Sequence, residues 1–408
     1  MDSSALLKNT FDTMYLISTV LNSECPDCEF VKAMDIAGIY KICKFHSLQS
    51  IVYAAIDSLL VKDADFVLEL PEYIHKDWKS MRKRIIRKDL AFDFEREKIL
   101  SFMEENGIWY LPMKGIYLRK FYPQMGLRYL ADNDILFDEK YRKTVRSFMV
   151  ERGYTVQSYG KGAHDVYTKD PFYNFEMHVG LYRGTGGDPR RIKLSEYYES
   201  IFEKLIKDPD KNFSYHMTDE DFYILLVTHA YKHHVCGGTG LRTFVDFYVF
   251  LSKMGEKLNW DYIRSELSKM DLVDYEKLIR SISEKLFSKE CVNLNRDDSV
   301  LSCEEEDTVL LYARSGTYGV KSRQMEESLS KYRNKSGKIT ASSKIKYCFR
   351  RVVPEMRYYK ENAEFVYKHK ILIPGFLVGR AFKAVFVKRN IKRELNQIKK
   401  VKTEKKGP

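Results

Sequence analysis

The sequence lacks any apolar run that could cross a bilayer. Its longest such run, Ile371 to Val387, contains Pro374, Arg380 and Lys383, so it is too short and too charged for a transmembrane helix. The opening residues, Met1 to Ser4, lack the basic segment that begins a secretory signal. The seven cysteines are an odd number scattered along the chain, which is typical of free thiols in a reducing compartment. We therefore expect a cytoplasmic protein without a transmembrane segment.

Internal repeats are also missing, and the low-complexity sequence is confined to Lys399 to Lys406. A hydrophobic fraction of 44%, with 14% aromatic residues, argues against a disordered chain. At 408 residues the chain is long enough for two or three structural units, each with a core of its own.

Acidic residues are scarce at the C-terminal end. From Ala341 to Pro408 there are 19 Lys and Arg residues against 5 Glu, which is a net charge of +14. The whole chain carries +12, so residues 1–340 carry −2. A segment this basic is typical either of a solvated charged surface or of contact with an anionic partner, such as a phosphate-rich molecule or an anionic lipid.

Helical periodicity dominates both ends of the chain and is interrupted in the middle. The patterns predict helices over 4–62 and 73–106, with a C-cap at Asn106-Gly107, and again from about 192 onward. Between them the sequence predicts strands over 108–113, 132–137, 154–159, 164–168 and 173–181, helices over 114–122 and 139–152, and a glycine-rich loop at 183–189.

This order predicts the α+β class, with a small mixed β-sheet core flanked by N-terminal and C-terminal helical regions. We divide the chain into an N-terminal helical region (1–106), the β-sheet core (107–190), a helical domain that completes the cleft (191–340) and a basic helical C-terminal region (341–408).

Carboxylates are concentrated on two of the predicted strands. Asp132 and Asp134 are two residues apart on one strand and share a face, as do Glu176 and His178 on another. If the two strands pair, three carboxylates converge and repel each other unless a cation lies between them. Hard oxygen ligands suit Mg²⁺, and a site with two Mg²⁺ ions that holds a nucleoside triphosphate (NTP) would explain the arrangement.

These motifs resemble the bacterial uncharacterised nucleotidyltransferase family, in the superfamily whose fold is shared with DNA polymerase beta. The resemblance rests on Met113-Lys114-Gly115, on the Gly-Leu-Arg-x-x-x-Asp-x-Asp-Ile-Leu stretch from Gly126 to Leu136, and on Glu176-Met177-His178. It extends to four later segments: 229–233, 240–246, 315–319 and 350–380. One departure is Gly115-Ile116, where the superfamily has Gly-Gly or Gly-Ser, so the phosphate contacts are expected to differ in detail.

The resemblance implies transfer of a nucleoside monophosphate from an NTP to a hydroxyl acceptor, with release of pyrophosphate. Asp132 and Asp134 would ligate Mg²⁺, and Glu176 would complete the second metal site and help to deprotonate the acceptor. Gly115 would let backbone N–H groups approach phosphate, and Lys114 and Arg128 would bind the triphosphate. Further cleft-lining residues implied by the resemblance are His178, His229, Arg242 and Asp246.

Several of these candidate site residues also have alternative interpretations. Asp-x-Asp is common in loops and at strand ends, and His178 could be a structural strand histidine. We expect His164 to be structural. Arg242 and Asp246 could be no more than an i, i+4 surface ion pair. His229 and His233, one helical turn apart, lack the glutamate of a zinc protease motif, and with Arg242 and Asp246 we expect them to line the cleft wall rather than only to hold two helices together.

Cys25, Cys28, Cys43 and His46 have the outline of a zinc site, although Cys43 and His46 lie inside a predicted helix that must pack on one face.

Two function classes compete with a nucleotidyltransferase: a catalytically inactive nucleotide-binding or regulatory protein of the same fold, and a nucleic-acid or membrane-surface binder that acts through its basic tail. The acceptor is undetermined among a protein side chain, tRNA, a sugar and a small molecule, and so is the preferred base.

Overall fold

The structure is a computed structural model that describes residues 2–62, 71–160, 162–182, 189–235, 237–289, 300–317, 339–353 and 363–386, together with residues 319, 325, 329, 332, 356, 359 and 398. Most of the predicted glycine-rich loop, residues 183–188, lies outside the described residues, as does the segment 399–406.

The N-terminal third is helical, as the periodicity predicts. Aspartates begin three of its helices: the side chains of Asp2, Asp27 and Asp35 accept hydrogen bonds from backbone N–H groups in the first turns of α1, α2 and α3. Asn106 is the C-cap of α5, and Gly107 follows with a φ of 66°. The helices are α1 (Ser3–Leu21), α2 (Cys28–Lys32), α3 (Ile36–His46), α4 (Gln49–Lys62) and α5 (Glu72–Glu105).

A five-stranded mixed sheet follows, with the order β1-β2-β5-β4-β3. The central pair, β2 and β5, is parallel, and the other neighbours are antiparallel. The strands are β1 (Tyr110–Pro112), β2 (Asn133–Phe137), β3 (Thr155–Ser158), β4 (His164–Lys169) and β5 (Tyr173–His178). Helix α6 (Gly115–Leu118), continued by a 3₁₀ turn to Phe121, connects β1 to β2, and α7 (Arg142–Glu151) connects β2 to β3.

The rest of the described chain is helical except for one short hairpin. The two-residue strands β6 (Ile206–Lys207) and β7 (Tyr215–His216) were not predicted, because two residues are too few to show a periodicity. The helices are α8 (Pro189–Tyr197), α9 (Asp219–Val235), α10 (Arg242–Met254), α11 (Trp260–Lys269), α12 (Val273–Phe287), α14 (Cys303–Ser315), α16 (Ala341–Val352), α18 (Glu364–Lys368) and α19 (Ile373–Phe386). None of the helices in the described ranges is both long and apolar enough to cross a membrane.

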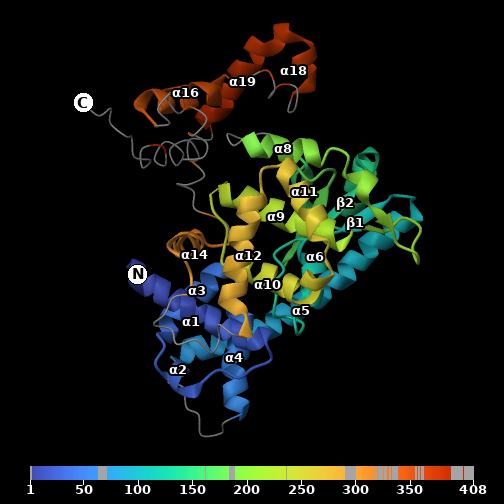
Figure 1. Cartoon of the computed structure of the whole chain (residues 1–408). Helices are drawn as coiled ribbons and strands as arrows, with labels where there is room; N and C mark the ends of the chain where they lie inside the picture. Colours follow the sequence, from blue (N-terminus) through green and yellow to red (C-terminus); the bar gives the residue numbers. More distant parts are fainter. Residues whose placement is uncertain are drawn as a thin grey trace.

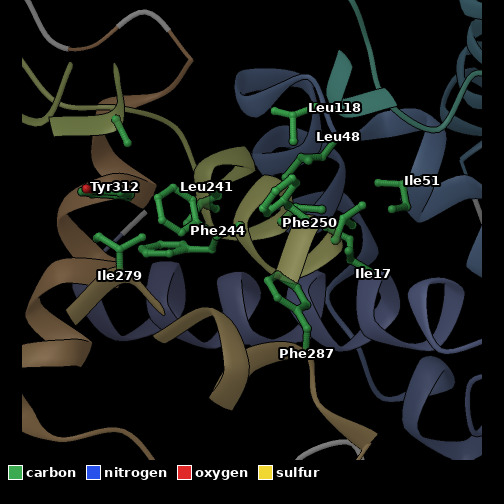
Figure 2. Packing of buried hydrophobic residues seen from close by; sticks show 14 of the residues in the cluster. Ile17, Leu48, Ile51, Leu118, Leu241, Phe244, Phe250, Ile279, Phe287 and Tyr312 are labelled. Carbon is green, nitrogen blue, oxygen red and sulfur yellow. The ribbon is translucent and has the colours of Figure 1, made fainter. Parts of the chain in front are cut away.

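Two hydrophobic clusters form most of the core. The larger one gathers side chains from the helices before and after the sheet, including Ile17 of α1, Phe250 of α10, Phe287 of α12 and Tyr312 of α14 (Figure 2). The smaller one contains the apolar side chains of the sheet, such as Phe175. In Figure 1 the C-terminal helices α16, α18 and α19 lie at the end of the molecule opposite to α1–α4.

Helix α5 links the two clusters. It has 34 residues, which corresponds to a length of about 50 Å. Ile74 and Trp78, near its start, are buried in the larger cluster, whereas Phe92, Ile99 and Met103 are buried in the sheet cluster. The predicted α+β class, with a mixed sheet between helical regions, is confirmed.

Candidate active site

The parallel pairing of β2 with β5 brings the predicted carboxylates together. Asp134 lies directly opposite Glu176 in the register, and Asp132 comes immediately before β2. The backbone of β2 is fixed on its other side as well, because the N–H of Met113 donates to the carbonyl of Asp134 over 3.1 Å. The prediction of three converging carboxylates required these two strands to pair, and they do.

Lys114 occupies the turn between β1 and α6 in a strained backbone conformation. Its φ of 53° and ψ of −119° lie where a Cβ is unfavourable, a strain of about 1–3 kcal/mol. Its Nζ is 2.5 Å from Oδ1 of Asp134. At Gly115 an added Cβ would lie 2.5 Å from Nη1 of Arg128 and 2.9 Å from Cδ2 of Leu130, so this position has no room for a side chain.

Burial and mutual repulsion separate the pKa values of the carboxyl groups. Burial, together with the negative charges of Asp134 and Glu176, raises the pKa of Asp132 to about 6. Burial also disfavours the charged form of Asp134, but the Lys114 ammonium and a hydrogen bond from His178 outweigh it and hold its pKa well below the usual range. Burial also opposes the ionisation of Glu176, but the nearby imidazole of His178, with its Nε2 3.6 Å from Oε2 of Glu176, outweighs it and lowers the pKa of Glu176.

The Lys114 ammonium is the one cation at ion-pair distance from Asp132, Asp134 or Glu176 among the lysines and arginines of the described residues. Two imidazoles complete the surroundings of these carboxylates. His178 Nε2 is 2.8 Å from Oδ1 of Asp134, and His164 Nε2 is 3.6 Å from Oε2 of Glu176. Burial and the neighbouring His178 lower the pKa of His164 to about 4, so this ring is neutral at neutral pH. Sequence reasoning missed the place of His164 beside the carboxylates.

Arg128 is bound to Asp246 rather than directed at the carboxylates. Its Nε and Nη2 donate to the two Asp246 oxygens over 2.8 and 2.9 Å, and the Tyr122 hydroxyl donates to Oδ1 of Asp246 over 2.8 Å. Arg242 instead donates from Nη1 to the carbonyl of Tyr129 over 3.0 Å. The alternative interpretation of Arg242 and Asp246 as an i, i+4 surface ion pair is therefore wrong. The Asp246 carboxylate instead binds Arg128, which lies 118 residues away in the chain.

The helical wall of the site comes from α9 and α10. His229 and His233 lie one turn apart on α9, with 3.2 Å between their Nε2 atoms, and burial lowers the pKa of both rings. Together with the sheet they enclose a cavity of about 360 Å³. Every predicted site residue lines this cavity. His233, which was expected to line the cleft beside His229, does line it, and lining residues that the sequence did not single out for the cleft include His164, Lys232, Thr239 and Thr243.

The zinc site outlined by Cys25, Cys28, Cys43 and His46 is not formed. The His46 ring accepts from the N–H of Leu241 at Nδ1 and contacts the carbonyl of Ala313 at Nε2, so neither nitrogen is available to a metal. Within the described part of the chain, the three histidine, cysteine or acidic side chains whose ligand atoms all lie within 4.8 Å of one another are His164, Glu176 and His178.

Comparisons with known proteins agree with this geometry. Residues 32–288, more than half of the chain, match the family described as "Uncharacterised nucleotidyltransferase". The matched range contains both strands that carry the carboxylates, the Lys114 turn and the α9–α10 wall. Comparisons with curated proteins and with solved structures gave no match. The extent of the family match shows that the chain belongs to the uncharacterised nucleotidyltransferase family.

Proposed function

We propose that the protein transfers a nucleoside monophosphate from an NTP to a hydroxyl group of an acceptor and releases pyrophosphate. The observation that carries this proposal is the register of β2 and β5, which places Asp134 opposite Glu176 at the wall of a 360 Å³ cavity with Asp132 beside them. Membership of a nucleotidyltransferase family supports an NTP as the donor and a divalent metal as the cofactor.

Asp132, Asp134 and Glu176 are the residues that would hold a pair of Mg²⁺ ions. The three acids face one ammonium at ion-pair distance, that of Lys114, and no residue of the described ranges forms an ion pair with Asp132. Asp132 and Asp134 would hold the ion that also contacts the triphosphate, and Glu176 would complete the second position. Bound Mg²⁺ supplies neutralisation of the negative charge on the phosphates.

The protein's own groups carry the remaining tasks. The acceptor oxygen forms a bond to the α-phosphorus as the bond to the bridging oxygen of pyrophosphate breaks, and the acceptor proton must leave. We assign that proton to Glu176, because its side chain lines the cavity and is 23% exposed. Gly115 gives the phosphates a backbone approach at the start of α6.

Positive charge for the triphosphate comes from several walls of the cavity. Lys114, Lys232 and Arg242 all line it. The sequence led us to expect that Arg128 binds the triphosphate, but its Nε and Nη2 are both used in the ion pair with Asp246. We therefore assign Arg128 the role of holding Gly115 and α10 in position, rather than a bidentate contact with phosphate.

The test is the melting temperature of the purified protein with each NTP, with and without Mg²⁺. A ligand that binds only the folded state at 100 times its Kd stabilises it by about 2.7 kcal/mol. We expect a Mg²⁺-dependent rise for at least one NTP that is absent in Asp134→Asn and retained in Asp261→Asn, a control at a carboxylate whose side chain is 93% exposed.

Pyrophosphate release should follow the same pattern once an acceptor is supplied. Nucleotide binding without any turnover, across protein, tRNA, sugar and small-molecule acceptors, would favour a catalytically inactive nucleotide-binding protein. The absence of a shift with every NTP, in a sample with a cooperative melt, would refute nucleotide binding at this cavity.

A further inference from the structure

The strand register places two imidazoles and one carboxylate on the same face of the sheet. In the antiparallel pair of β4 and β5, His164 lies directly opposite His178, and Glu176 precedes His178 by two residues. The two rings are 4.7 Å apart between centroids. The sequence pattern indicated only a structural role for His164, because its position opposite His178 depends on the register.

The three side chains are spaced like the ligands of one cation. Oε2 of Glu176 is 3.6 Å from Nε2 of His164 and 3.6 Å from Nε2 of His178. One ligand atom of each residue lies within 4.8 Å of those of the other two. Two ligand atoms bound at about 2.1 Å to one ion, with angles from 90° to 120°, are about 3.0 to 3.6 Å apart, so the Glu–His separations need little adjustment.

The second nitrogen of His178 supports the same conclusion. Its Nδ1 is 3.4 Å from the carbonyl oxygen of Gly180, while its Nε2 faces Oδ1 of Asp134 at 2.8 Å. Both neighbours are acceptors, and a neutral imidazole has one N–H to donate. In the structure the Nε2 N–H of His178 donates to Asp134. A cation bound at Nε2 would displace that proton to Nδ1, where the Gly180 carbonyl can accept it, as backbone carbonyls commonly do for metal-bound histidines.

We propose that His164, His178 and Glu176 form a site for a divalent first-row transition-metal ion, of the Mn²⁺, Co²⁺ or Zn²⁺ type. Imidazole nitrogen binds such ions better than it binds Mg²⁺, which prefers oxygen ligands alone. This proposal rests on the proposed function because it assumes the same two metal positions. It adds that the metal position completed by Glu176 differs in its ligand chemistry from the position held by Asp132 and Asp134.

The test uses Co²⁺ as the probe, on the metal-free full-length protein without nucleotide. Calorimetric titration gives the affinities for Co²⁺ and Mg²⁺, and the visible absorption of bound Co²⁺ reports nitrogen ligation. We expect Co²⁺ to bind at least about tenfold more tightly than Mg²⁺ and His164→Ala to weaken Co²⁺ binding by at least about tenfold. The affinity for Mg²⁺ should be unchanged in that variant.

His164→Gln is the second variant, because it keeps a polar side chain of similar reach while removing the imidazole. His369→Ala is the matched control, since His369 is exposed in the C-terminal region. Circular dichroism confirms that each variant is folded. Equal Co²⁺ affinity in the wild type, His164→Ala and His164→Gln would overturn the proposal, as would an absence of Co²⁺ binding to the wild type.

The two proposals fail in different ways. If NTP raises the melting temperature in a Mg²⁺-dependent way but Co²⁺ affinity does not depend on His164, the transition-metal site is refuted and the proposed nucleotidyl transfer is not. Tight, His164-dependent Co²⁺ binding without any NTP shift does the reverse, since the Co²⁺ titration contains no nucleotide.

Discussion

Removing the Asp246 carboxylate tests a buried ion pair of the site. Arg128 is 8% exposed and Asp246 is 7% exposed. Burial opposes ionisation of Asp246, but the Arg128 guanidinium outweighs it and lowers the pKa of Asp246. Arginine cannot shed its proton, so Asp246→Ala would leave an uncompensated buried charge. Breaking such a pair costs about 3–5 kcal/mol.

A double-mutant cycle separates the ion pair from the other contacts of each residue. We expect Arg128→Met with Asp246→Leu to be at least about 2 kcal/mol more stable than Asp246→Leu alone, because apolar replacement of both partners removes the stranded charge. The Tyr122 hydroxyl still loses its acceptor in the double variant, so recovery should be incomplete by about 1–2 kcal/mol.

The assay is urea unfolding followed by circular dichroism, with the free energy of unfolding taken by linear extrapolation at constant slope. Asp261→Ala is the control, because the Arg264–Asp261 pair is exposed and its loss should cost less than about 1 kcal/mol. If Asp246→Ala costs no more than this control, or if the double variant is as unstable as the sum of its single variants, the reasoning is refuted.

Three further predictions concern other parts of the molecule. Burial lowers the pKa of His46 to about 4 from 6.5, so between these pH values the unfolded state binds a proton that the folded state does not. The free energy of unfolding should therefore fall by about 3 kcal/mol as the pH drops from 6.5 to 4. In His46→Gln, urea unfolding at a series of pH values should lack this contribution to the pH dependence. Gly115→Ala should cost about 1–3 kcal/mol of unfolding free energy through the clash with Arg128, whereas Gly255→Ala, whose Cβ would meet its nearest atom at 3.9 Å, should cost less than 1 kcal/mol in the same urea assay. If the C-terminal region (341–408) binds an anionic partner, co-sedimentation with anionic vesicles or retention on single-stranded RNA should weaken steeply with salt; binding that is indifferent to salt would contradict this.

Local patterns predicted most of the fold and part of the site. The alternation around Asp134 and Glu176 fixed which side chains share a face, and the structure pairs their strands. The partner of Asp246 was not predictable in this way, because Arg128 is 118 residues away, and the helical spacing suggested the nearer Arg242. His164 was missed for the same reason, since its position opposite His178 depends on a strand register that its own segment does not determine.

The helix that links the two hydrophobic clusters has a consequence for how the molecule opens. Because α5 buries Trp78 in one cluster and Ile99 in the other, the sheet cannot separate from the helical body unless one end of this helix is exposed to water. Segments that share such an element tend to open as one cooperative unit. The central amides of α5 should therefore exchange their hydrogens with solvent only through global unfolding, and the five-stranded sheet and its helical surroundings should be lost in a single transition.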